Sequence, residues 1–244
     1  MRIAIVGYGK MGHEIERQAS AMGVQSAEIF DVEMPLTDLR KDTFDVAIEF
    51  TAPESVRPNI EWLARHGKDV VVGTTGWQKH YDVIKALVTR HNIGLIHSPN
   101  YSIGVYLFLR LVRAAAQAYQ AFPEYDIAVH ETHHNQKADA PSGTAIRIGE
   151  TILSEWMSKT SLFTGALSGK IAPEALQITS SRLGVVAGEH SVAIDSLSDA
   201  IELKHTAKNR AGFAIGALRA AEWISGKKGI YSMDDMMADI LQRH

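Results

Sequence analysis

A glycine-rich loop near the start of the chain limits most strongly what this sequence can fold into. The segment Gly7-Tyr8-Gly9-Lys10-Met11-Gly12 has the pattern G-x-G-x-x-G and lies between an apolar run over 2–6 and a predicted helix over 11–22. In such a loop the first glycine permits a tight turn, the second lets the backbone approach a pyrophosphate, and the third lets helix and strand pack closely. The loop therefore predicts a dinucleotide site, and an ordinary tight turn is the alternative.

Asp31 is the expected partner of that loop. It lies at the end of a second predicted strand over 27–30, where a carboxylate would hold the adenosine ribose 2′-OH, although a strand-end Asp can also be a turn or cap residue. Asp31 and Glu33 would repel a 2′-phosphate, and no arginine follows Asp31 to offset them, whereas Lys10 could reach a phosphate. We expect NADH to be preferred, with NADPH also usable.

Strands and helices alternate through the first hundred residues. Apolar strands are predicted over 45–50, 69–72 and 93–97, and helices over 56–66 and 81–90. Nearly all-apolar strands that alternate with helices predict a parallel sheet covered on both faces. We expect an α/β fold with a Rossmann-type, doubly wound parallel sheet.

The pattern changes after Asn100. Helices are predicted over 105–119 and 144–156, a strand over 126–131, and three antiparallel strands over 176–181, 190–194 and 200–205. The segment 158–173 is the least periodic and is predicted to be a mobile loop, and two helices follow over 213–224 and 233–241. We expect a dinucleotide-binding domain formed by 1–104 and 213–244, with an α+β substrate domain, 105–212, inserted into it.

Two further loops follow predicted strands at the edge of the sheet where ligands of open α/β folds bind. In Gly73-Thr74-Thr75-Gly76 the small residues allow close approach to a cofactor and the hydroxyls can bond to it; a polar loop with a helix cap is the alternative. In Ser98-Pro99-Asn100-Tyr101, Asn100 could bond the nicotinamide amide and Tyr101 could stack near its ring, or both could be turn residues.

The segment 132–144 carries the densest chemistry in the sequence. Ser142, Gly143 and Thr144 begin a predicted helix, so their backbone N–H groups and hydroxyls form a carboxylate-binding site without net charge. Lys137 adds a cation, and the pair His133-His134 adds groups that titrate near neutral pH. This combination suits a small dicarboxylate that is reduced and protonated.

Structural and metal-binding roles are the alternatives for this segment. A His pair can be a solvated loop feature, and Ser-Gly-Thr can be only a helix cap. With His130 and Glu131 the cluster could also bind a metal, but neighbouring side chains of a strand point to opposite faces. We predict no metal.

Composition excludes several classes of protein. The chain has no cysteine, so disulfides, zinc-thiolate sites and cysteine nucleophiles are impossible. Its net charge of -3 lacks the basic excess of a nucleic-acid binder, and no apolar run is long enough to span a membrane. The first strand begins at once, which leaves no room for a signal peptide. We expect a cytoplasmic protein with no nucleic-acid or membrane partner.

The segment 133–145 resembles the signature His-His-x-x-Lys-x-Asp-Ala-Pro-Ser-Gly-Thr-Ala of the 4-hydroxy-tetrahydrodipicolinate reductase (dihydrodipicolinate reductase) family. The resemblance extends over nearly the whole chain and includes Gly7–Gly12, Gly73–Gly76, Ser98–Gly104, and Arg182-Leu-Gly184 with Gly188-Glu-His190. The chain departs from the family at Pro99 and Tyr101, at Asp31 where Glu is frequent, and in the short segment 32–43, where one helix is expected to be missing. These departures bear on cofactor preference more than on the reaction.

The resemblance implies an enzyme of lysine and diaminopimelate biosynthesis. It would transfer nicotinamide hydride to C4 of a cyclic dicarboxylate, reducing 4-hydroxy-tetrahydrodipicolinate to tetrahydrodipicolinate with overall loss of water. It implies that His133 is the acid/base and that Lys137 is a proton donor or charge stabiliser. The expected substrate-binding residues are His134, Ser142, Gly143 and Thr144. The expected cofactor-binding residues are Gly7, Tyr8, Gly9, Lys10, Met11, Gly12, Asp31, Gly73, Thr74, Thr75, Ser98, Pro99, Asn100 and Tyr101.

The resemblance also implies a homotetramer formed through the sheet of the substrate domain, and Arg210 is similar in position to a mobile family arginine that reaches the substrate. Two other functions stay open: another two-domain nicotinamide oxidoreductase, such as an amino-acid or imino-acid dehydrogenase, and a non-catalytic dinucleotide sensor. Neither requires the complete run from His133 to Thr144.

Overall fold

The computed structural model describes residues 1–38 and 43–243, which form two compact units. Unit 1 comprises Met1–Ser102 and Arg210–His244, and unit 2 is Ile103–Asn209. Each unit has its own apolar core. The chain therefore leaves unit 1 once, completes unit 2 and returns.

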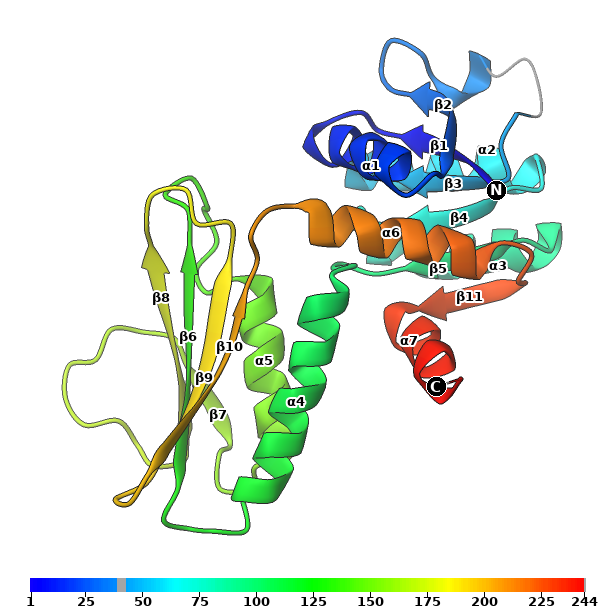
Figure 1. The fold of residues 1–244 in the computed structure, drawn as a ribbon. Helices are drawn as coiled ribbons and strands as arrows, with labels where there is room; N and C mark the ends of the chain where they lie inside the picture. Colours follow the sequence, from blue (N-terminus) through cyan, green and yellow to red (C-terminus); the bar gives the residue numbers. More distant parts are fainter. Residues whose placement is uncertain (39–42, 244) are drawn as a thin grey trace. The chain divides into compact units, whose positions relative to one another are not determined.

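Unit 1 is built on a six-stranded parallel sheet, which confirms the predicted doubly wound α/β class (Figure 1). The strand order is β11-β5-β4-β3-β1-β2. The four inner strands β5, β4, β3 and β1 are mostly apolar, and nearly all of their side chains are buried because both faces of the sheet are covered. The strand bounds are β1 Arg2–Val6, β2 Gln25–Phe30, β3 Val46–Glu49, β4 Asp69–Val72, β5 Gly94–His97 and β11 Gly229–Ser232.

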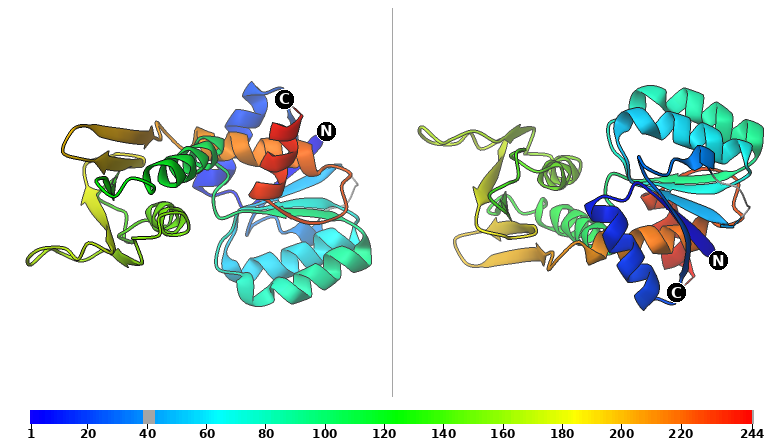
Figure 2. Two further views of the ribbon diagram at one scale, coloured as in Figure 1. Left: turned by 90° about the horizontal axis from the view of Figure 1, so that it is seen from below. Right: turned by 90° about the horizontal axis from the view of Figure 1, so that it is seen from above.

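Helices cover both faces of this sheet. Figure 2 shows α2 and α3 on one face and α1 with α6 on the other. The helix bounds are α1 Lys10–Ala21, α2 Pro53–Arg65, α3 Tyr81–His91, α6 Ala211–Ile224 and α7 Met233–Gln242. In the described part of segment 32–43 the only helical element is the 3-10 turn η1, Leu36–Asp38, and a second such turn, η2, spans Gln78–His80. Residues 39–42 of that segment lie outside the described residues.

Unit 2 has a five-stranded mixed sheet in the order β10-β9-β6-β8-β7. The helices α4, Ile103–Tyr119, and α5, Gly143–Leu153, pack against one face of it (Figure 1). The strand bounds are β6 Asp126–His133, β7 Ser161–Phe163, β8 Ala175–Arg182, β9 Glu189–Asp195 and β10 Ala200–Thr206.

Two predictions for unit 2 were wrong. The strands predicted over 176–181, 190–194 and 200–205 were expected to form an antiparallel set linked by turns, but β8 does not pair with β9. The strand β6 lies between them, and β8 pairs in parallel with β6 and β7, because α5 lies between β6 and β8 in the chain and acts as a crossover connection. The segment 158–173, predicted to be a mobile loop, contains the short strand β7 at the sheet edge. The strand β11 in unit 1 was not predicted at all, since four half-buried residues give little periodic signal.

No helix of the described residues is long and apolar enough to cross a membrane.

Candidate functional site

The glycine loop joins β1 to α1 as predicted, and its glycines have separate roles. Gly7 has φ of +93°, and a Cβ there would lie 2.3 Å from the carbonyl oxygen of Phe50 at the end of β3. A Cβ on Gly12 would lie 2.4 Å from the carbonyl oxygen of Gly7, so this glycine lets α1 pack against the loop. A Cβ on Gly9, the N-cap of α1, would meet no heavy atom within 4 Å. The fold itself therefore requires Gly7 and Gly12, whereas Gly9 leaves open space at the helix N-terminus, as a pyrophosphate site needs.

A cleft of about 690 Å³ lies beside this loop. Its lining includes Gly7, Tyr8 and Gly9 of the glycine loop and Asp31 and Glu33 after β2. The Asp31 carboxylate accepts hydrogen bonds from the backbone N–H groups of Glu33 and Met34, at 2.9 and 3.0 Å. Asp31 is therefore a turn residue and also part of the cleft wall, and the two interpretations of the sequence are compatible.

The loop after β4 meets the glycine loop at a second hollow of about 450 Å³. Gly73, Thr74 and Thr75 line it together with Gly9, Lys10 and Met11. A side chain at Gly73 would collide with the Phe50 ring, and the Thr74 hydroxyl accepts the N–H of Thr51 at 2.8 Å. Thr74 thus holds the loop in place, and Thr75 is exposed.

The segment after β5 requires a correction. Tyr101 is only 2% exposed, and its hydroxyl lies 3.1 and 3.0 Å from the carbonyl oxygens of Val72 and Ile96. Burial raises the pKa of Tyr101 well above its ordinary value. The ring belongs to the core, so the predicted stacking near a nicotinamide is wrong for this side chain.

The neighbours of Tyr101 form a hydrogen-bonded turn. The Ser98 hydroxyl is buried and donates to the carbonyl oxygen of Asn100 at 2.7 Å, and the Asn100 side-chain oxygen accepts the N–H of Ser102 at 2.8 Å. Pro99 is exposed at the tip of the turn. Cofactor contacts from Ser98, Pro99 and Asn100 stay predictions.

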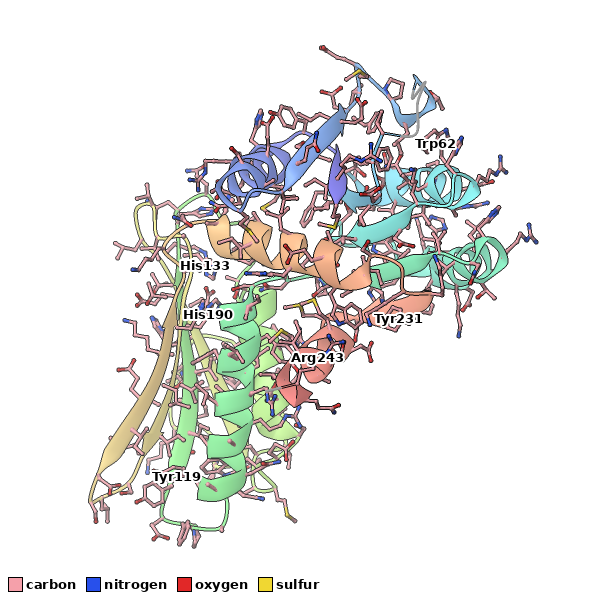
Figure 3. All side chains as sticks on the ribbon, turned by 45° about the vertical axis from the view of Figure 1, so that its right-hand side comes forward. Trp62, Tyr119, His133, His190, Tyr231 and Arg243 are labelled. Atoms are coloured by element: carbon pink, nitrogen blue, oxygen red, sulfur yellow. The ribbon has the colours of Figure 1, made fainter. Side chains whose placement is uncertain are left out.

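Unit 2 gathers a second group of side chains at one end of its sheet. Alternate residues of β6 share a face: Ile127 and Val129 join the core under α4 and α5, and Glu131 and His133 continue the same face beyond it. His190 on β9 pairs in register with Glu131, and Arg182 on β8 pairs with His133. Figure 3 shows His133 and His190 near one end of the sheet and Tyr119 at the other. Three adjacent strands therefore supply one cluster.

Glu131 is the centre of this cluster. Its side chain is fully buried; Oε2 bonds Nδ1 of His133, and Oε1 accepts from Nη1 of Arg182 at 3.0 Å. Burial alone would raise the pKa of Glu131, but hydrogen bonds from Ser180, His133 and Arg182 together outweigh it and lower that pKa. The buried carboxyl group is therefore ionised at neutral pH.

Several groups act on the imidazole of His133. Burial lowers its pKa, Glu131 opposes that effect, and the cations Lys137 and Arg182 add to it, so the pKa ends below its ordinary value. Gly188 lies beside the ring, since a Cβ there would be 3.0 Å from Nε2. The imidazole thus has one nitrogen held by a carboxylate and the other next to a residue without a side chain.

Lys137 lies in the loop that follows β6. Its Nζ donates to Asp139 at 2.7 Å, and its side chain is about one-fifth exposed. Arg182 bonds the carbonyl oxygens of both residues, Nε to Lys137 at 3.3 Å and Nη2 to Asp139 at 2.5 Å. The same guanidinium therefore ties the Lys137 loop to Glu131.

His190 connects the cluster to the start of α5. Its Nε2 lies 3.1 Å from the Ser142 hydroxyl oxygen, and its ring lies 5.2 Å from that of His133. Burial lowers the pKa of His190 to about 4, so the ring is neutral at physiological pH. Nδ1 of His190 is buried and has no hydrogen-bond partner among the described residues.

Ser142 is the N-cap of α5, as the sequence predicted. Its hydroxyl oxygen accepts the N–H of Ala145 at 3.1 Å and also meets His190, and the residue is 3% exposed. The hydroxyl thus has two contacts within the fold, and a substrate contact from Ser142 stays a prediction. Gly143 is exposed and Thr144 is half-buried at the N-terminus of the helix.

A metal could in principle use this cluster. Ligand atoms of Glu131, His133 and His190 lie within 4.8 Å of one another. The carboxylate already accepts from Arg182, and Lys137 is close enough to affect both imidazoles. These cations disfavour a further cation, and the absence of a metal stays a prediction.

Sequence reasoning gave no role to Glu131, Arg182 or His190. Glu131 was weighed only as a metal ligand, although its position two residues before His133 on a strand places both on one face. Arg182 and His190 lie 51 and 59 residues after Glu131 in the sequence, and only the register of the sheet brings them together.

Comparison with known proteins identifies the family. The family model described as dihydrodipicolinate reductase, N-terminus, matches residues 1–101, and the model described as dihydrodipicolinate reductase, C-terminus, matches residues 104–237. A 4-hydroxy-tetrahydrodipicolinate reductase from Christiangramia forsetii is 35% identical over 99% of this chain and 100% of its own length. The enzyme of the same name from Methanosarcina mazei is 38% identical over 96% of this chain and 88% of its own length.

A solved structure shows the same fold. Dihydrodipicolinate reductase from Paenisporosarcina sp. TG-14, with dipicolinate bound, has a TM-score of 0.74 and 22% identity to this chain, covering 95% of this chain and 97% of that one. Because both family models match and the relatives span nearly the full length, the chain belongs to the dihydrodipicolinate reductase family of pyridine-nucleotide-dependent oxidoreductases.

Proposed function

We propose that this chain reduces 4-hydroxy-tetrahydrodipicolinate to tetrahydrodipicolinate, a step of lysine and diaminopimelate biosynthesis, with His133 and Lys137 as its proton-handling groups. The observation that carries the proposal is the cluster of Glu131, His133, Lys137 and Arg182 beside the N-terminus of α5. A dehydrogenase of another substrate class or a dinucleotide sensor would need no such cluster.

The chemistry follows from the charges. Loss of the 4-hydroxyl group as water leaves a conjugated imine whose C4 is electrophilic. NADH or NADPH held at the glycine loop would supply a hydride to that carbon, and the substrate ring would then hold the electrons as an enamine. A proton must next reach a ring carbon, and a protonated His133 or Lys137 can donate it. General acid catalysis of this kind contributes typically about 10²–10⁴-fold.

Substrate carboxylates have two suitable places in unit 2. The N-terminus of α5 offers the backbone N–H groups of Gly143 and Thr144, and no residue fills the space that a Cβ on Gly143 would enter. His134 and Lys137 supply positive charge or hydrogen-bond donors at the other place. A bound dianion would also favour the protonated form of His133, which counteracts the effect of burial on its pKa.

NADH is the proposed preferred cofactor. Asp31 and Glu33 both line the larger cleft and both would repel a 2′-phosphate. Gly7–Gly12 and Gly73–Thr75 would hold the pyrophosphate and nicotinamide half, because Gly9 and the second hollow leave room there.

A homotetramer formed through the unit 2 sheet is part of the proposal. The sheet face opposite α4 and α5 has no helix over it among the described residues, and it carries polar and small side chains such as His130, Thr179 and Ser191. A cytoplasmic location stays a prediction from the biosynthetic role.

The test follows absorbance at 340 nm with NADH and then NADPH, with the substrate generated in the cuvette from pyruvate and aspartate semialdehyde. We expect rapid oxidation only when both condensation substrates are present. His133→Gln and Lys137→Met should each lower kcat by roughly 10²-fold, as expected for lost acid catalysis, while NADH binding survives. No oxidation by a protein that binds NADH would refute the proposal, and an equal loss of cofactor affinity in both variants would refute the two role assignments.

A further inference from the structure

The buried carboxylate of Glu131 has no role in the mechanism above, yet each of its oxygens has a specific partner. Oε2 meets Nδ1 of His133, and Oε1 meets Nη1 of Arg182. We propose that Glu131 is a positioning residue that keeps the proton of neutral His133 on Nδ1, and that Arg182 fixes the orientation of Glu131. This inference rests on the proposed function of His133 as the acid.

The proton position follows from the donor inventory. An ionised carboxylate can only accept hydrogen bonds, so the nitrogen that faces Glu131 must carry a hydrogen. Nδ1 is that nitrogen, which leaves Nε2 as the end of the ring that gains and loses the catalytic proton. The absence of a side chain at Gly188 leaves space next to Nε2.

The proton transfer conserves both atoms and charge. Protonated His133 gives its Nε2 hydrogen to a ring carbon of the substrate, so an N–H bond breaks as a C–H bond forms. The product is neutral His133 with its remaining hydrogen on Nδ1, which is the form that Glu131 stabilises. Glu131 keeps its charge throughout, and solvent returns the proton to Nε2.

Arg182 makes the orientation testable. A guanidinium has only donors, so it requires an acceptor at the position of Oε1. In Glu131→Gln the amide oxygen must therefore face Arg182, and the NH₂ group must face His133. Nδ1 would have to accept from that NH₂, and the imidazole hydrogen would move to Nε2. In serine proteases a comparable change from carboxylate to amide holds the wrong tautomer and lowers kcat by about 10⁴-fold.

The charged and titratable groups around His133 come from three strands and one loop. They are Glu131 on β6, Lys137 after β6, Arg182 on β8 and His190 on β9. His190 is neutral at physiological pH, so it does not compete with His133 and Arg182 as a cation for the carboxylate of Glu131.

The experiment records histidine ¹⁵N chemical shifts of the full-length protein between pH 5 and pH 9, with His133 assigned through His133→Gln, and measures kcat and KM on the same samples. We expect the Nδ1–H tautomer in the wild type and the Nε2–H tautomer in Glu131→Gln, with kcat lowered by roughly 10²-fold or more and the KM for NADH unchanged. In the double variant Glu131→Gln, Arg182→Met the amide is free to turn, so the Nδ1–H tautomer should return and kcat should rise above that of Glu131→Gln.

Glu155→Gln is the matched control. It removes a carboxylate of unit 2 that is also ion-paired, to Arg113, but lies outside the cluster, and it should change neither tautomer nor kcat. If Glu131→Gln does not fold, Glu131→Asp keeps the charge but shortens the side chain. That variant should keep the Nδ1–H tautomer with an intermediate kcat.

The outcomes separate this inference from the proposed function. An Nδ1–H tautomer in Glu131→Gln with kcat within about twofold of wild type, or wild-type kcat in Glu131→Asp, overturns the positioning role. If the wild-type protein has no reductase activity but the tautomer still differs between wild type and Glu131→Gln as expected, the proposed function fails and the positioning of His133 by Glu131 stands.

Discussion

Replacing Gly7 and Gly9 by alanine should separate the folding role of the glycine loop from its binding role. Both residues belong to the same six-residue loop, and both changes add one methyl group. The surroundings differ: a Cβ on Gly7 would lie 2.3 Å from the Phe50 carbonyl oxygen and 2.8 Å from Cγ2 of Thr51, whereas a Cβ on Gly9 would meet nothing within 4 Å.

Two costs apply to Gly7→Ala. A non-glycine residue in the left-handed region at φ of +93° costs about 1–2 kcal/mol, and forcing a methyl group into packed backbone costs about 1–3 kcal/mol. The free energy of unfolding should therefore fall by roughly 2–5 kcal/mol. For a chain of this size that corresponds to a Tm lower by roughly 5–15 °C.

Gly9→Ala should behave differently. Gly9 has φ of -83° and ψ of -158°, which alanine adopts freely. Alanine is a weaker N-cap by up to about 1 kcal/mol, but it loses less entropy on folding by about 0.4–1 kcal/mol, so stability should stay within about 1 kcal/mol of wild type. The new methyl group would occupy the space where a pyrophosphate approaches, and the Kd for NADH should rise by about tenfold or more, equivalent to about 1.4 kcal/mol.

The assay is urea unfolding followed by tryptophan fluorescence, together with titration of each variant with NADH. Gly7→Ala as stable as the wild type would show that the contact with Phe50 does not constrain the loop. Wild-type NADH affinity in Gly9→Ala would refute the assignment of this loop to the cofactor.

Three further predictions concern charge. Asp31→Ala should raise kcat/KM for NADPH relative to NADH, since a carboxylate that repels a 2′-phosphate is removed; an unchanged ratio in the 340 nm assay would contradict it. Burial raises the pKa of Glu49, so the contribution of this residue to stability is present at low pH and is lost as pH rises through its folded-state pKa. The Tm of Glu49→Gln minus the Tm of wild type should therefore increase from pH 4 to pH 8. An equal Tm difference at the two pH values would count against the raised pKa. Burial lowers the pKa of His190 from 6.5 to about 4, so the contribution of this residue to stability is present above pH 6.5 and is lost as pH falls toward 4. In urea titrations over that pH interval, the free energy of unfolding of wild type should fall by up to about 3 kcal/mol more than that of His190→Gln. Equal decreases in the two proteins would refute the lowered pKa.

Much of unit 1 could be predicted because its signals are local. The apolar strands, the glycine loop and the helix that follows it depend on residues within about ten positions of one another, and the structure places β1, α1, β3 and β4 near the predicted limits. The cap at Ser142 was equally predictable, since a serine before a helix start is a local pattern. The short strands β7 and β11 were missed because three or four residues at a sheet edge carry too little periodicity.

The candidate site also combines features that a local segment predicts with contacts that depend on distant residues. The sequence indicated His133 and Lys137 because they lie in one dense segment, but the burial of Tyr101 and the occupied hydroxyl of Ser142 depend on distant partners. No local pattern shows that a tyrosine after β5 fills the core under two strands.

The sequence by itself determined the class of fold, the position of the dinucleotide loop and the segment that carries the chemistry, because turn, cap and periodicity rules act over a few residues. The tertiary structure alone decided that β8 runs parallel to β6 and that Arg182 and His190 join Glu131 and His133. Those contacts depend on strand register and on the crossover through α5. Both are set by pairing between distant segments, because the burial of apolar surface and the pairing of polar groups are satisfied over the whole of unit 2 and not within a few residues.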